Sequence, residues 1–75
     1  MKSKNNIGNN IKLLREINKL SMDDLCACLN KCGAKIDKSM ISRWEAGINS
    51  PSLENAIFLA HFFHVSVDEL AGATN

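Results

Sequence analysis

The chain has 75 residues, enough for one small domain that buries about 60% of its extended-chain surface. With a single proline, no tyrosine and no apolar run of about 18 residues, it fits neither a sheet protein nor a membrane span. Up to Arg43 there are nine cations against four acids, a charge of +5, and after it four acids and no cation, a charge of −4. This separation favours an anionic partner at one end of the molecule, although scatter over a solvated surface would also produce it.

The N-terminus and the cysteines exclude several classes of protein. Residues 1–6 are polar and aperiodic and lack the apolar region of a signal peptide, so a flexible arm and a cytoplasmic location are expected. Cys26, Cys28 and Cys32 are expected to be reduced thiols, and their spacing differs from that of zinc-binding cysteine pairs. Because no catalytic constellation or Gly-rich phosphate loop is present either, we expect no metal, no cofactor and no enzyme.

Two helices are predicted in the first third of the chain. A helix over 7–18 has four apolar residues on one face: Ile7, Ile11, Leu14 and Ile17. Ser21 can cap the next helix, over 22–30, and Asp24 completes a capping-box-like arrangement. The buried residues of that helix would be Leu25, Cys26 and Leu29. Gly33 can adopt the left-handed conformation that ends a helix.

A third helix is expected to start from the N-cap Asp37, run to Ala46 and stop at Gly47. Its apolar face comprises Ile36, Met40, Ile41 and Trp44. The opposite face carries short or cationic polar side chains, namely Lys38, Ser39, Ser42 and Arg43. Arg and Lys can donate to guanine O6 and N7 in the major groove of DNA, and Ser can contact a base or a phosphate. The pattern favours a helix that packs by one face and binds DNA by the other.

Two more helices complete an all-α chain. Ser50 or Ser52 can cap a fourth helix, whose inner face is expected to be Leu53, Ala56, Ile57, Ala60 and Phe63. Ser66 and Glu69 form a second capping box for a short fifth helix that ends near Gly72. Five helices this short need tertiary packing to hold them. The expected organisation is one domain over 7–72, followed by a short tail over 73–75.

Several short segments combine into one recognisable pattern: Ile7-Gly8, Arg15-Glu16, Leu20-Ser21, Leu25, Ile41-Ser42-Arg43-Trp44-Glu45, Gly47, Pro51-Ser52-Leu53, Ala60 and Val65-Ser66-Val67-Asp68-Glu69-Leu70. The pattern resembles the lambda-repressor and Cro-like (XRE-type) helix-turn-helix domain. The resemblance implies a five-helix lambda-repressor-like fold. It also implies a sequence-specific, repressor-like transcriptional regulator, usually a homodimer on an inverted repeat in double-stranded DNA.

The resemblance also assigns roles to individual residues. It places a recognition helix over 37–46, with base-reading positions at Lys38, Ser39 and Arg43 and a lesser candidate at Ser42. The candidate contacts to the DNA backbone are Lys12, Met22, Lys31, Lys35, Asn49 and Ser50. Arg15 and Glu45 would form a structural ion pair that holds the recognition helix in place.

The chain departs from the family pattern in three places. The turn over 31–37 is longer than usual, and Met22 stands where Gln usually contacts a phosphate, which leaves only backbone amides as donors there. The loop after the recognition helix offers Asn49 and Ser50 instead of a cation. Fewer cationic contacts predict modest affinity and a weaker dependence on salt.

Phe58 and Phe62 of the fourth helix support an alternative interpretation. They could form an apolar surface for a second protomer or another protein, although a core wider than the helical wheel suggests would explain them equally well. The alternative function is a protein-interaction module on the same fold, antitoxin-like or anti-repressor-like, in which DNA binding is secondary.

Overall fold

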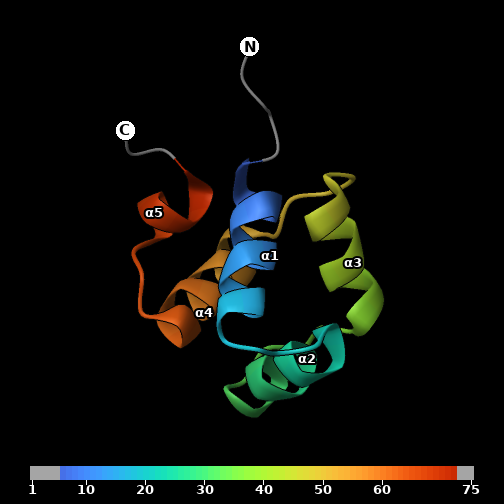
Figure 1. The fold of residues 1–75 in the computed structure, drawn as a ribbon. Helices are drawn as coiled ribbons and strands as arrows, with labels where there is room; N and C mark the ends of the chain where they lie inside the picture. Colours follow the sequence, from blue (N-terminus) through green and yellow to red (C-terminus); the bar gives the residue numbers. More distant parts are fainter. Residues whose placement is uncertain (1–5, 73–75) are drawn as a thin grey trace.

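The computed structural model describes residues 6–72, which form five helices and no strand (Figure 1). The helices are α1 (Asn6–Ile17), α2 (Met22–Lys31), α3 (Lys38–Ala46), α4 (Leu53–Phe63) and α5 (Val67–Ala71). The predicted all-α, five-helix architecture is confirmed. Of the expected N-terminal arm, residues 1–5 lie outside the described residues and Asn6 already begins α1. The expected tail over 73–75 also lies outside them.

Side chains close in sequence cap the beginnings of four helices. Ser21 and Asp24 form the predicted capping box of α2, with both hydrogen bonds 3.0 Å long. Asp37 caps α3, and Ser52 rather than Ser50 caps α4. Ser66 forms the capping box of α5 with Glu69. Each cap is worth about 0.5–2 kcal/mol, so these boundaries are fixed locally.

Left-handed residues end three of the helices. Gly47 and Gly72 terminate α3 and α5 with φ angles of 79° and 75°. His64 terminates α4 with φ 59°, and its backbone N–H bonds to the last turn. Gly33, with φ 112°, follows α2 by two residues. The predicted stops at Gly47 and Gly72 are therefore confirmed.

None of the described helices is long and apolar enough to cross a membrane.

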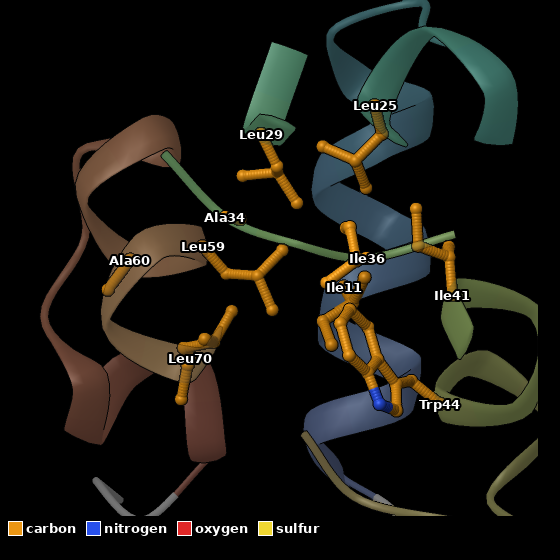
Figure 2. Packing of buried hydrophobic residues seen from close by; sticks show 11 residues of the cluster. Ile11, Leu25, Leu29, Ala34, Ile36, Ile41, Trp44, Leu59, Ala60 and Leu70 are labelled. Atoms are coloured by element: carbon orange, nitrogen blue, oxygen red, sulfur yellow. The ribbon is translucent and has the colours of Figure 1, made fainter. Parts of the chain in front are cut away.

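One apolar core is shared by all five helices and by the turn between α2 and α3 (Figure 2). Its buried members are Ile11, Leu25, Leu29, Ala34, Ile36, Ile41, Trp44, Ala56, Leu59, Ala60 and Leu70. Figure 2 shows Trp44 of α3 lying against Ile11 of α1, with Leu59 and Leu70 approaching from α4 and α5. Of the predicted apolar face, Ile41 and Trp44 are buried on α3 and Ile36 in the turn before it, whereas Met40 is only half-buried.

The first helix lies between α3 and α5 (Figure 1). Gly8 is buried where α1 meets the end of α3, and a Cβ at this position would lie 2.1 Å from the carbonyl oxygen of Trp44. On the other side, Asn10 Nδ2 donates to the carbonyl oxygen of Leu70 at 2.9 Å. The close approach at Gly8 brings the carboxyl end of α3 against α1, which fixes where the polar face of α3 points.

The predicted apolar faces of α1 and α4 were wrong in part. Ile17 is 63% exposed because it is the last residue of α1 and lies past the edge of the core. On α4, Leu53 and Ile57 are 70% and 42% exposed, whereas Leu59 is fully buried. Apolar residues surround α4 on nearly all sides, so a helical wheel does not identify the face that packs.

Candidate nucleic-acid interface

The polar face of α3 is open to solvent along its whole length. Lys38, Ser39, Ser42 and Arg43 are all exposed, while Ile41 and Trp44 anchor the opposite face in the core. Because residues three and four apart share one side of a helix, Ser39, Ser42 and Arg43 form one continuous surface. This surface has the size and chemistry for contact with base edges in a major groove.

Arg15 and Glu45 hold α3 to α1. Arg15 Nε donates to Glu45 Oε2 at 2.7 Å, and Nη2 donates to Oε1 at 3.0 Å, which makes the pair bidentate. Arg15 Nη1 also donates to the carbonyl oxygen of Leu20 at 2.9 Å. The side chains are only 12% and 5% exposed, and the hydrogen bond to Glu45 is the main reason that the pKa of Arg15 is raised. Neither group is available to DNA.

Asn30 fixes the long turn that leads into α3. Its amide Nδ2 donates to the carbonyl oxygen of Ile36, and its Oδ1 accepts from the Ile36 backbone N–H, both at 2.9 Å. Ala34 and Ile36 are buried, so the turn contributes to the core instead of extending away from it. Sequence reasoning expected Ile36 to fill the core but missed Asn30, whose only signal is a carboxamide at the end of α2.

The first turn of α3 contains the predicted cap and two polar contacts that sequence reasoning missed, from Ser39 to Asp37 and from Lys38 to Asp23. Ser39 Oγ donates to Asp37 Oδ1 at 2.7 Å, and the backbone N–H of Met40 donates to the same oxygen at 3.0 Å. These bonds, with that of Ser39 the larger cause, hold the pKa of Asp37 below its ordinary value. Lys38 Nζ lies 3.6 Å from Asp23 Oδ2 at the start of α2, and both side chains are exposed.

Two grooves flank α3 and contain four of the six candidate backbone contacts. One, of about 370 Å³, separates α3 from α1 and the start of α2 and is lined by Lys12, Arg15, Met22, Ser42, Glu45 and Ala46. The other, of about 260 Å³, separates α3 from the loop before α4 and is lined by Met40, Arg43, Trp44, Asn49, Ser50, Ser52 and Asn55. Lys12, Asn49 and Ser50 thus lie on the two sides of α3, where the sequence analysis expects contacts to the DNA backbone.

Lys31 and Lys35 are not brought to these grooves. Lys31 is the last residue of α2, about 14 Å along the helix axis from Met22. Lys35 lines a separate hollow together with Glu54, Asn55 and Phe58. The turn thus places Lys35 beside the start of α4.

The candidate partner surface lies on α4. Phe58 and Phe62 are half-buried and pack against the core, so the wider-core explanation accounts for part of their surface. The remainder opens into a groove of about 370 Å³ lined by Cys32, Ile57, Phe58, His61 and Phe62. We refer to these five residues as the α4 groove.

The cysteines are free thiols, and within residues 6–72 no three His, Cys, Asp or Glu side chains are grouped as metal ligands. Cys26 is half-buried, and its Sγ lies 3.5 Å from the carbonyl oxygen of Ile36, beside the amide of Asn30. It therefore contacts the same turn that Asn30 holds.

Comparison with protein families matches residues 11–70 to the model described as helix-turn-helix, which covers most of the chain and every element of the site. No curated protein and no solved structure matches the chain. The matched segment contains α2, the turn and α3 in full, together with the Arg15–Glu45 pair. The chain belongs to the helix-turn-helix family of the XRE and Cro type, a family of non-enzymatic DNA-binding domains found typically in transcriptional regulators.

Proposed function

We propose that this protein is a sequence-specific, repressor-like regulator that inserts α3 into the major groove of an operator. Lys38, Ser39, Ser42 and Arg43 would read base edges. Phosphates would be contacted by Lys12, the first-turn amides at Met22, Asn49 and Ser50. Lys31 and Lys35 stay weaker candidates because they lie away from the grooves beside α3. Binding to DNA implies action in the cytoplasm.

The observation that carries this proposal is the exposure of one polar face of α3 while its other face is anchored in the core. Arg43 is exposed, and its guanidinium fork can bond guanine O6 and N7 together. The Arg15–Glu45 pair and the close approach at Gly8 hold the helix from behind. A rigidly held helix can present side chains to base edges without first paying the cost of ordering.

We further propose that two copies bind an inverted repeat. The longest extent of the structure is 35 Å, close to one turn of DNA, so two copies could lie side by side with one half-site each. With few cations beside α3, one copy would bind modestly, and a second copy on the same duplex would raise the affinity through effective concentration. The two recognition helices would then be about 34 Å apart.

The test is selection of bound sites from random DNA duplexes at about 100 mM salt, where the Debye length is near 10 Å. Enrichment of an inverted repeat by the wild type, with loss of a guanine preference in Arg43→Ala, would support a dimeric base reader. A wrong base opposite a bidentate Arg costs about 1–3 kcal/mol, so the change should exceed about fivefold. Lys19→Ala is the matched control, since Lys19 is an exposed cation in the loop between α1 and α2. If no site is enriched, the operator-reading proposal fails.

The α4 groove favours a second candidate, the protein-interaction module. Ile57, which lines the groove, is 42% exposed, and Phe62 lies edge-on to Phe63 with ring centroids 5.0 Å apart. Exposed apolar side chains grouped in this way are typical of contact surfaces. Because Phe58 also packs against the core, Ile57→Lys is a cleaner probe than Phe58→Ser. If Ile57→Lys loses dimerisation while Arg43→Ala remains a dimer, the groove binds a second copy of the chain. If both variants are monomers, the groove is not assigned to a second copy.

A further inference from the structure

The first turn of α3 presents hydrogen-bond acceptors to the solvent. A serine hydroxyl has a single proton, and that of Ser39 is donated to Asp37 Oδ1 over 2.7 Å. What remains on Ser39 Oγ is acceptor capacity, and Asp37 is also an acceptor when ionised. Both side chains are exposed. At the amino-terminal end of the proposed reading surface, Asp37 and Ser39 therefore offer only acceptors, beside the donor Lys38.

The hydrogen bond from the Ser39 hydroxyl to Asp37 should persist when DNA approaches. A hydroxyl that donates to a carboxylate forms a charge-assisted bond, roughly twice as strong as one between neutral groups. The carboxylate is charged at neutral pH, since even the ordinary pKa of an aspartate, 3.8, lies well below 7, and the bonds from Ser39 and Met40 lower the pKa of Asp37 further. Turning the hydroxyl of Ser39 towards a base acceptor would break this bond in exchange for a weaker one. Ser39 is thus held as an acceptor.

Arg43 supplies hydrogen-bond donors one turn further along α3. It lies four residues after Ser39, on the same side of α3, and both are exposed. The guanidinium has five N–H donors and no acceptor. Along the helix axis the two positions are about 6 Å apart, which corresponds to roughly two base-pair steps of 3.4 Å.

We propose that α3 selects two base edges of opposite character. Ser39, held by Asp37, accepts from the exocyclic amino group of a cytosine or an adenine, and Arg43 donates to a guanine about two steps away. These amino groups are the only hydrogen-bond donors that bases present in the major groove. A guanine or thymine opposite Ser39 would set acceptor against acceptor. The inference rests on the proposed function and adds which chemical group each end of α3 selects.

The experiment compares sites selected from random duplexes by the wild type, Ser39→Ala, Asp37→Gly and Arg43→Ala. The wild type should favour cytosine or adenine at one position by about fivefold to tenfold, the value of one hydrogen bond, beside an Arg43-dependent guanine. Ser39→Ala should lose only the amino-base preference. Asp37→Gly keeps an accepted N-cap residue and frees the hydroxyl of Ser39, so guanine and thymine should become tolerated at that position. Circular dichroism establishes that each variant is folded.

A second measurement leaves the protein unchanged. In the selected duplex, the cytosine or adenine is replaced by an analogue with hydrogen in place of the amino group, which should weaken wild-type binding about fivefold to tenfold and leave Ser39→Ala unaffected. Equal weakening of both proteins, or a guanine or thymine at the Ser39-dependent position, overturns this inference. If Arg43→Ala still loses its guanine in that case, the proposed function stands. If the wild type enriches no site, both fail.

Discussion

Asn30 bonds to Ile36 through both ends of its carboxamide, as donor to the carbonyl oxygen and acceptor from the N–H, each at 2.9 Å. The bonds join two residues six apart in the sequence, across the turn between the end of α2 and the start of α3. They pair the backbone of a residue that is otherwise surrounded by the core. A turn longer than the family's usual one thereby becomes a fixed spacer between the two helices.

We expect Asn30→Ala to destabilise the fold by about 1–3 kcal/mol, since two partly buried backbone groups of Ile36 would lose their partners. Urea unfolding monitored by the fluorescence of Trp44 measures the change. Asn18→Ala is the control, because Asn18 Nδ2 also donates to a backbone carbonyl, that of Leu14, but at an exposed site. If the two variants lose similar amounts of stability, the hydrogen bonds of Asn30 to Ile36 have no special role in holding the turn.

Gly8→Ala should lower stability by about 1–3 kcal/mol or more, although Ala is the better helix former. The added Cβ would lie 2.1 Å from the carbonyl oxygen of Trp44, so α1 and α3 would have to separate. Thermal unfolding of Gly8→Ala beside Asn9→Ala, an exposed neighbour on the same helix, tests this. A Tm equal to or above that of the wild type would show that the contact is not tight.

Removing one partner of the Arg15–Glu45 pair should cost about 3–5 kcal/mol, because the remaining charge would be buried without compensation. Glu45→Met and Arg15→Met measure the two single losses. The double variant Arg15→Met with Glu45→Met should recover part of the stability, since neither buried charge remains. A double loss equal to the sum of the single losses would mean that the two residues do not act as a pair.

Stability should fall in acid because two helix caps depend on carboxylates. The pKa of Asp24 is lowered by its bonds with the backbone and hydroxyl of Ser21, and that of Asp37 by its bonds from Ser39 and Met40. In the unfolded chain both return to about 3.8. Their contribution is therefore present above 3.8 and is lost as the pH falls from there through the lowered folded values.

The measurement is the free energy of unfolding between pH 2 and 7. Asp24→Asn with Asp37→Asn retains side chains that can cap but removes both titrations, so the loss of stability below about pH 4 should be smaller than in the wild type. Glu54→Gln serves as the comparison, since Glu54 is exposed and the cap of its helix is formed by Ser52. If the double variant loses as much stability below about pH 4 as the wild type, the two caps do not cause the loss in acid.

The sequence predicted the helix boundaries well because the signals are local. Ser21 and Asp24, three residues apart, specify the start of α2 without reference to the rest of the fold. Gly47 and Gly72 specify two ends in the same way, since the left-handed conformation costs glycine little.

Residues whose roles depend on distant packing were harder to predict. Leu59 rather than Leu53 is buried because α2 and α5, not the pattern of α4, decide which side of that helix is covered. The position of Lys35 follows from the path of the turn that Asn30 holds by its hydrogen bonds to Ile36. No characteristic spacing in the sequence marks Asn30 for this role. Whether Ser39 acts as a donor or an acceptor depends on the direction of its hydroxyl proton. Only the geometry at Asp37 shows that direction.

The packing of α1 between α3 and α5 has a consequence for how the protein meets its ligand (Figure 1). Every Lys and Arg lies at or before Arg43, and α4 and α5 carry only acids among their charged residues, His aside. The acids of α5 therefore lie on the far side of α1 from α3. If α3 binds DNA as proposed, repulsion between these acids and the phosphates would disfavour approach by the α5 side, so more encounters would begin with α3 towards the duplex.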